Sequence, residues 1–141
     1  MKKAVYIVVI GCGRLGSILA SSLSQQGHEV VVIDKNPSAF SGLTEGFSGF
    51  TMTGNAAEMN VLEAAKLNRS QVAIAVTGKD NLNIMVSQLA KNVFQVPIVL
   101  TRILDPAREE IYQQLGLNTI STTKIAATAF LQNLQRQLGD S

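Results

Sequence analysis

Short apolar runs alternate with amphipathic stretches along the whole chain. The first run, residues 4–10, is continuously apolar and rich in β-branched residues, which is typical of a strand buried on both faces of a parallel sheet. Apolar residues then recur at helical spacing from Arg14 to about Gln26, and Gly27 follows as a helix C-cap. The chain therefore begins with a predicted strand, a glycine-containing turn and a helix.

The same alternation continues toward the end of the chain. We predict further strands at 30–33, 50–53, 72–76, 97–101 and 118–121, and helices just after Asn36-Pro37 and at 59–67, 80–91, 105–115 and 122–138. We expect Asp80 or Asn81 to cap the helix at 80–91. Strands that alternate with helices predict an α/β fold with a doubly wound parallel sheet, in the order 3-2-1-4-5-6. Since no linker interrupts the pattern, residues 1–141 are expected to form a single domain.

The turn after the first strand has the pattern G-x-G-x-x-G, in the order Gly11, Cys12, Gly13, Arg14, Leu15, Gly16. The first glycine permits a tight turn, the second lets phosphate oxygens approach the backbone, and the third lets the helix pack close to the strand. The helix N-terminus favours an anion, and Arg14 adds a positive charge there. Because the motif lies between a buried strand and a helix, it predicts a Rossmann-type domain that holds the diphosphate of an adenine nucleotide.

An acidic residue closes the second predicted strand. Asp34 follows the glycines by about 20 residues, the spacing at which a carboxylate accepts hydrogen bonds from ribose hydroxyls. A carboxylate there would also repel a 2′-phosphate, so NAD or a plain adenine nucleotide is expected rather than NADP. The neighbouring Lys35 weakens that preference slightly.

Three later loops should meet at the same edge of the sheet, because each follows a parallel strand. Asn55, within Gly54-Asn55-Ala56, could contact the edge of the adenine. The loop from Thr77 and Gly78 to Asp80 could contact the phosphates or a second ribose, and Arg102 could reach the mouth of the cleft. All of these residue types are also common in ordinary turns or surface ion pairs, so a purely structural role stays open for each.

Composition narrows the functional classes. The 141 residues are 46% hydrophobic and 16% charged, and the Lys and Arg residues behind the net charge of +2 are dispersed, which does not favour nucleic-acid binding. No stretch approaches the ~20 apolar residues of a membrane span. One cysteine, Cys12, excludes an intrachain disulfide; it is either a reactive thiol at a helix N-terminus or, more commonly, a small packing residue. No catalytic triad and no metal-ligand spacing is evident.

Several motifs together resemble a known family, the N-terminal lobe of regulator of K⁺ conductance (RCK) domains, also called KTN or TrkA-N domains. The matching blocks are 9–16 (VIGCGRLG), 32–36 (VIDKN), 54–56 (GNA), 75–83 (AVTGKDNLN) and 101–106 (TRILDP). Nearly the whole chain is covered, and the later blocks are more specific than the glycines. The resemblance implies a cytosolic regulatory subunit that controls a K⁺ transporter or channel and binds NAD, NADH, ATP, ADP or AMP.

The resemblance also implies roles for individual residues. The phosphates would be held by the glycine turn, Gly11, Cys12, Gly13, Arg14, Leu15 and Gly16. The adenosine ribose would be bound by Asp34 and Lys35, and the adenine would be flanked by Asn55 and Ala56. The phosphate and distal-ribose side would be lined by Thr77, Gly78, Asp80 and Arg102. The family usually has Asp where this chain has Asn55, and an amide donates as well as accepts hydrogen bonds. That difference bears on which nucleotide the chain binds.

The last predicted helix bears on assembly. Ala127, Phe130, Leu131, Leu134 and Leu138 recur at helical spacing. This apolar stripe would either pack on the chain's own sheet or, as the resemblance implies, cross to a neighbouring copy in a homodimer or ring. The implied location is the cytoplasm, at the inner face of the membrane, with an integral-membrane partner and no direct insertion.

Two other functional classes are alternatives to a regulatory subunit. An NAD-dependent oxidoreductase, or a fragment of one, needs a catalytic residue near the nicotinamide and a substrate domain, and the chain ends where that domain would begin. A redox-sensing transcription factor needs a DNA-reading helix and a basic face. Neither requirement is met by the sequence, so a non-enzymatic sensor is expected.

Overall fold

The computed structural model describes residues 3–139, so the first two and last two residues of the predicted domain lie outside the described part. The strands are β1 (Tyr6–Ile10), β2 (Glu29–Asp34), β3 (Phe50–Thr53), β4 (Val72–Ala75), β5 (Ile98–Ile103) and β6 (Asn118–Ser121). The α-helices are α1 (Arg14–Gln25), α2 (Met59–Ala64), α3 (Asp80–Gln88), α4 (Glu109–Gln114) and α5 (Thr122–Gln137).

The strands form one six-stranded sheet in the order β3-β2-β1-β4-β5-β6, and every described pairing is parallel. This confirms the predicted Rossmann-type α/β fold and its strand order. The strand order changes direction at β1. Strand β2 pairs with β1 on one side, and β4 pairs with β1 on the other side. A reversal of this kind opens a crevice at the carboxyl ends of the strands, and the glycine turn after β1 lies there.

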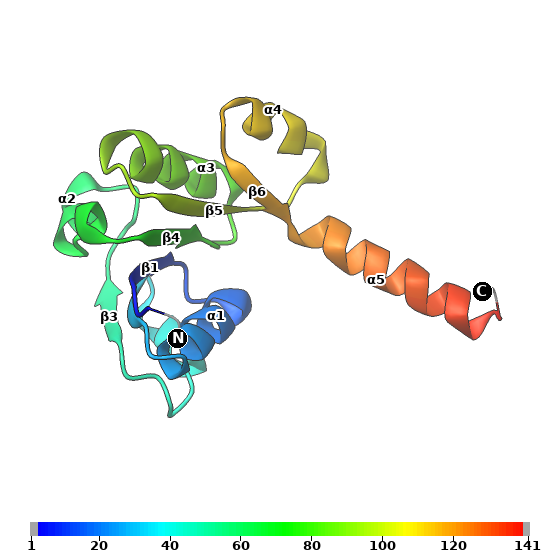
Figure 1. Cartoon of the computed structure of the whole chain (residues 1–141), viewed down its shortest axis with the longest axis horizontal. Helices are drawn as coiled ribbons and strands as arrows, with labels where there is room; N and C mark the ends of the chain where they lie inside the picture. The colour runs from blue at the N-terminus through cyan, green and yellow to red at the C-terminus, as the bar shows by residue number, and fades with distance from the viewer. Residues whose placement is uncertain (1–2, 140–141) are drawn as a thin grey trace.

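Hydrophobic clusters cover both faces of the sheet. On one face, α1 packs Ala20 against Val9 and Val32 of the central strands. On the other face, α2 and α3 pack Leu62 and Val86 against the sheet, as their arrangement in Figure 1 shows. The central strands are therefore buried from both sides, which is why their sequences are continuous apolar runs without alternation.

The helices differ in detail from their predicted extents. The predicted helix at 59–67 ends as α2 at Ala64, and a separate 3₁₀ turn occupies Leu67–Arg69. The predicted helix at 80–91 continues past α3 as a π-helical turn, Leu89–Val93. The segments after Asn36 and Asp105 begin as 3₁₀ turns, each with a proline in its first turn.

The last helix does not pack on its own sheet. Figure 1 shows α5 leaving the end of β6 and running away from the body of the domain as an isolated arm. Its apolar stripe is exposed along its length, with Phe130 at 79% and Leu134 at 54% exposure. Of the two interpretations of the stripe, packing within the same chain is therefore wrong for this structure.

Candidate functional site

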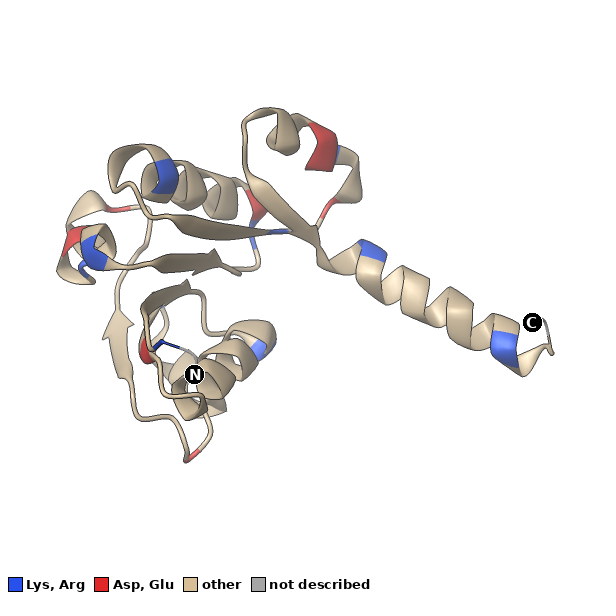
Figure 2. Cartoon of the chain, viewed as in Figure 1, with Lys and Arg blue, Asp and Glu red and all other residues tan. Residues whose placement is uncertain are grey.

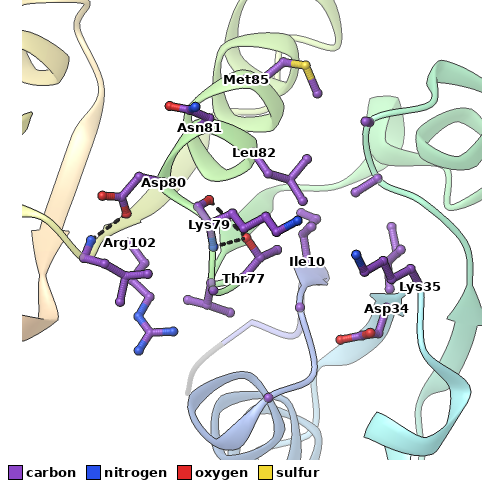
Figure 3. Close-up of a pocket in the computed structure, with 18 of the residues that line it drawn as sticks. Ile10, Asp34, Lys35, Thr77, Lys79, Asp80, Asn81, Leu82, Met85 and Arg102 are labelled. Carbon is purple, nitrogen blue, oxygen red and sulfur yellow. Dashed lines mark hydrogen bonds between the residues drawn. The ribbon is translucent and has the colours of Figure 1, made fainter.

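One large cavity lies at the carboxyl edge of the sheet, above the switch point between β1 and β4. Its volume of ≈ 1060 Å³ is slightly above the ~300–1,000 Å³ typical of small-molecule sites. Figure 3 shows Asp34 and Lys35 on one side of it, Ile10 and Thr77 in the middle, and Asp80 and Arg102 on the other side. With the residues that follow β3 also in its lining, the cavity crosses the sheet from the end of β3 to the end of β5.

The glycine turn forms the floor of this cavity. Gly11 has φ +106°, and a Cβ there would lie 2.9 Å from the backbone nitrogen of Thr77, so both conformation and space require glycine. A Cβ built on Gly13 meets no atom within 4 Å, and Gly13 lines the cavity. The turn thus leaves bare backbone exposed to the cavity at the N-terminus of α1, which suits an anion.

Gly16 has a different role from Gly13. It is buried, and a Cβ there would lie only 1.9 Å from the carbonyl oxygen of Gly11. Close approach of α1 to the preceding turn therefore depends on Gly16, as the sequence motif predicts.

Asp34 is held in a fixed orientation at the end of β2. Its Oδ2 accepts a hydrogen bond from the backbone N–H of Cys12 at 2.8 Å, and its Oδ1 accepts one from the backbone N–H of Asn36 at 2.9 Å. A carboxylate has about four acceptor positions, so both oxygens keep the capacity to accept ribose hydroxyls. The same carboxylate thus ties the glycine turn to the end of β2 and lines the cavity.

Asn55 follows β3 at the same edge. Its side-chain oxygen accepts a hydrogen bond from the backbone N–H of Ala57 at 2.9 Å, which leaves the amide NH₂ as the group free to donate. Asn55 and Ala56 both line the cavity, as does Lys35.

The loop after β4 is organised by a buried amide. Asn83 is fully buried, and its Oδ1 accepts from the backbone N–H of Thr77 at 2.9 Å and from the Thr77 hydroxyl at 2.7 Å. Its Nδ2 donates to the backbone carbonyl of Arg102 at 3.1 Å. A single side chain therefore fixes the ends of β4 and β5 relative to each other beside the cavity.

The expectation that Asp80 or Asn81 caps α3 is wrong. The N-cap is Lys79, without a side-chain hydrogen bond, and Asp80 stands in the first turn. The Asp80 carboxylate instead accepts from the backbone N–H groups of Leu104, at 2.6 Å, and Asp105, at 2.9 Å. These backbone donors lie in the turn after β5, and a carboxylate that satisfies both of them holds this turn against α3.

The structure separates the predicted site residues into two groups. Ten of the fourteen line the cavity: Gly11, Gly13, Asp34, Lys35, Asn55, Ala56, Thr77, Gly78, Asp80 and Arg102. Cys12, Arg14, Leu15 and Gly16 are not among the lining residues. Cys12 and Gly16 are buried, Leu15 packs in the core on the α1 face, and the Arg14 side chain is exposed.

Cys12 is a packing residue. Its side chain is 2% exposed in the core on the α1 face. Burial, and secondarily the Asp34 carboxylate, raises the pKa of the Cys12 thiol above its ordinary value. A raised pKa lowers the population of the nucleophilic thiolate, so the reactive-thiol interpretation is not supported.

Sequence reasoning missed several lining residues that belong to helix beginnings. Leu82 and Met85 of α3 line the cavity, together with Asn81, Leu104, Asp105 and Arg108. Lys79, which belongs to the loop predicted from Thr77 to Asp80, lines the cavity as well. The signal was present, because a segment that directly follows a parallel strand starts at the same edge of the sheet. The charged lining side chains are Lys35, Lys79, Arg102 and Arg108 beside the carboxylates Asp34, Asp80 and Asp105. Arg108 pairs with Asp105 at 3.7 Å, whereas Lys35, Lys79 and Arg102 supply positive charge that suits an anionic ligand.

Three other kinds of feature bear on function among the described residues: metal-binding clusters, membrane-crossing helices and basic surfaces. Within residues 3–139, no group of three or more His, Cys, Asp or Glu side chains is placed to hold a metal ion. In the same range, no helix combines the length and the apolar character that a membrane crossing requires. Figure 2 shows Lys and Arg spread over separate elements rather than gathered on one of them.

These observations define the class: a Rossmann-type domain with the glycine turn and the strand-end carboxylate of nucleotide-binding members. The TrkA-N domain family model matches residues 7–123. The chain therefore belongs to the TrkA-N domain family, as the sequence motifs indicate.

A curated relative agrees with this family assignment, and solved structures agree with the fold. The chain is 41% identical over 130 residues to the Trk system potassium uptake protein TrkA of Streptomyces coelicolor, covering 92% of this chain and 58% of that protein. It is similar in fold to the Kef C-terminal domain of Shewanella denitrificans in an AMP-bound form, with a TM-score of 0.81, 24% identity, and coverage of 96% and 83%. It is also similar to the GsuK channel bound to NAD, with a TM-score of 0.71, 21% identity, and coverage of 88% and 22%. The chain spans 58% of the length of its Streptomyces relative.

Proposed function

We propose that this chain is the nucleotide-sensing domain of a cytoplasmic regulator of a K⁺ transporter or channel, and that it is not an enzyme. The observation that carries the proposal is the pairing of bare backbone at Gly13 with the oriented Asp34 carboxylate in one cavity. These groups suit a diphosphate and an adenosine ribose. The association with K⁺ rests on the potassium uptake function in the name of the relative that is 41% identical.

The ligand class follows from the residues present. Bare backbone at Gly13 and the positive side chains of Lys35, Lys79 and Arg102 fit phosphate groups. Asp34 fits unmodified ribose hydroxyls and would repel a 2′-phosphate. An adenine nucleotide or NAD(H) fits better than NADP on this basis. Titration calorimetry with NAD, NADH, ATP, ADP and AMP tests the proposal, and saturable binding by one or more of them is expected.

Asp34→Ala supplies a comparison variant for this titration. Binding should weaken at least tenfold, and thermal unfolding must accompany the measurement because the variant also leaves the N–H groups of Cys12 and Asn36 without their acceptor. If none of the five nucleotides binds the wild-type domain, the sensing function is refuted. Catalytic turnover of NADH would instead favour the alternative function, an NAD-dependent oxidoreductase.

Assembly as a homodimer or a ring belongs to the same proposal. The apolar stripe of α5 is exposed in the single chain, and between Lys124 and Arg136 the helix carries no charged residue. The α1 face of the sheet also presents exposed Ile98 and Ile120 at its β5–β6 end. A second copy whose α5 lies on this face would bury both apolar surfaces.

Regulation requires that a nucleotide favour one arrangement of the assembly. A ligand that binds two arrangements with equal affinity does not shift the equilibrium between them. The cavity must therefore differ in shape between the two arrangements. The expected consequence in cells is a K⁺ uptake rate that responds to nucleotide binding. A chromosomal Gly13→Ala substitution should abolish that response, and an unchanged uptake rate would argue against the regulatory role.

A further inference from the structure

The base of α5 is joined to the wall of the cavity by two hydrogen bonds. Arg102, which lines the cavity, donates from its Nε to the hydroxyl of Thr122 at 3.2 Å. The hydroxyl of Thr123 donates to the backbone carbonyl of Leu104 at 2.7 Å, and Leu104 also lines the cavity. The first two residues of α5 are thus anchored on residues that a ligand in the cavity would contact.

The rest of the arm is free of the domain body. Beyond Lys124, which pairs with Glu109 of α4, every residue of α5 is exposed. The direction of the arm is therefore set by the contacts of its first turn. The 16 residues of α5 extend about 24 Å at ~1.5 Å per residue, so a rotation of about 10° at the base moves the far end by about 4 Å.

The Arg102 guanidinium is suited to bridge a ligand and Thr122. Among residues 3–139, the structure shows no hydrogen bond from its Nη1 or Nη2 to protein, while Nε is engaged by Thr122. Guanidinium groups bind phosphate through two parallel N–H donors, and such charge-assisted bonds are about twice as strong as neutral ones. Arg102 itself is held by Asn83, which binds its backbone carbonyl and the Thr77 loop together.

We propose that Arg102 couples occupancy of the cavity to the direction of α5, by bridging a phosphate of the bound nucleotide through its terminal nitrogens and Thr122 through Nε. This inference rests on the proposed nucleotide-sensing function. A bound nucleotide immobilises the guanidinium and thereby fixes the base of the arm. Without a nucleotide, the Arg102 side chain is free to leave Thr122, and the arm samples a wider range of directions.

The matched variants are Thr122→Val and Thr122→Ser. Thr122 does not line the cavity, so neither variant removes a ligand contact. Valine keeps the shape of threonine without the hydroxyl, whereas serine keeps the hydroxyl that Arg102 binds. The coupling should be lost in the first variant and retained in the second, while the affinity for nucleotide changes less than threefold in either.

Distances between spin labels on the arm and on the body provide the readout. Labels at Glu63→Cys and Gln135→Cys, in a Cys12→Ala background diluted with unlabelled wild-type chain, report distances within one copy by pulsed electron paramagnetic resonance. With saturating ADP or NAD, whichever calorimetry shows to bind more tightly, the distance distribution should narrow. The narrowing should persist in Thr122→Ser and disappear in Thr122→Val.

The outcomes separate this inference from the proposed function. If calorimetry shows no nucleotide binding, the proposed function itself fails. If nucleotide binds but the distribution does not change, or narrows equally in Thr122→Val, the coupling through Arg102 is overturned while nucleotide binding stands.

Discussion

Two alanine substitutions in the glycine turn should have opposite consequences, although they are only three residues apart. Gly13 has φ −73° and ψ −161°, an extended conformation that alanine adopts freely, and its added Cβ would meet no protein atom within 4 Å. Gly16 would place its Cβ 1.9 Å from the carbonyl oxygen of Gly11 and 2.8 Å from its carbonyl carbon. Both of these neighbours are backbone atoms, so no side chain can move to relieve the overlap.

The magnitudes follow from this geometry. For Gly13→Ala, the lower entropy of the unfolded chain stabilises by about 0.4–1 kcal/mol, and the poorer helix N-cap offsets it, so stability should change by less than about 1 kcal/mol. The new methyl group faces the cavity, and overpacking of a close contact costs about 1–3 kcal/mol, or about 5–150-fold in nucleotide affinity. For Gly16→Ala, the same overpacking cost falls on the fold, and the melting temperature should drop by about 4 °C or more.

Thermal unfolding and titration calorimetry on both variants, beside the wild type, test this reasoning. Gly13→Ala should melt like the wild type and bind nucleotide weakly, whereas Gly16→Ala should melt earlier. A Gly13→Ala variant that is folded and binds with wild-type affinity would refute the placement of phosphate against Gly13. A Gly16→Ala variant as stable as the wild type would refute the argument from close packing of α1.

Three further predictions concern the arm and the core. Leu134→Ala should weaken self-association by about 2 kcal/mol or more, roughly thirtyfold, in sedimentation equilibrium, while Gln132→Ala on the opposite side of α5 leaves it unchanged; equal effects would contradict assembly through the stripe. The Cys12 thiol should react with iodoacetamide far more slowly than an exposed cysteine at neutral pH, because burial raises its pKa, and rapid alkylation of the folded domain would contradict its packing role. The hydrogen bond from Lys124, and after it the charge of Lys124, lowers the pKa of Glu109 from its ordinary value of 4.5. The stabilising contact between α4 and α5 is therefore fully present above pH 4.5 and is lost as pH falls through the lowered pKa of the folded chain. The arm-to-body distance distribution should broaden in that acidic range, and a Glu109→Gln variant should show no such transition.

Features set by local sequence were predicted well. A few neighbouring residues are enough to predict the buried strand β1, the glycine turn and the carboxylate of Asp34 at the end of β2. The alternation of strands and helices predicts a parallel sheet. Ten of the fourteen proposed site residues line one cavity, because the carboxyl ends of parallel strands meet at one edge. Arg14 is the informative exception, since its position at a helix start does not fix where a long side chain points.

Features set by contacts across the fold were not predictable in the same way. Asp80 has the residue type and the position of a helix cap, yet its carboxylate binds backbone N–H groups more than twenty residues away. Asn83 lies at the end of the matching block 75–83, but its role is visible only once β4 and β5 lie side by side. In both cases a polar side chain satisfies backbone groups of a distant loop, and the tertiary arrangement decides which loop that is.

The position of α5 depends both on local sequence and on contacts across the fold. An amphipathic stripe predicts that a helix buries one face, but it does not predict which surface covers that face. The same pattern therefore fits a helix that packs on the sheet of its own chain and a helix that packs on the sheet of a neighbouring copy. The structure resolves this by placing the first turn of the helix on Arg102 and Leu104, at the edge of the cavity, and leaving the stripe exposed. An arm that is anchored at a ligand site and apolar along its length can link ligand occupancy to assembly, because its direction determines how its stripe meets a second copy. Under the proposed function, sensing and assembly meet at the junction of β6 and α5, where substitutions should change the response to nucleotide more than the affinity for it.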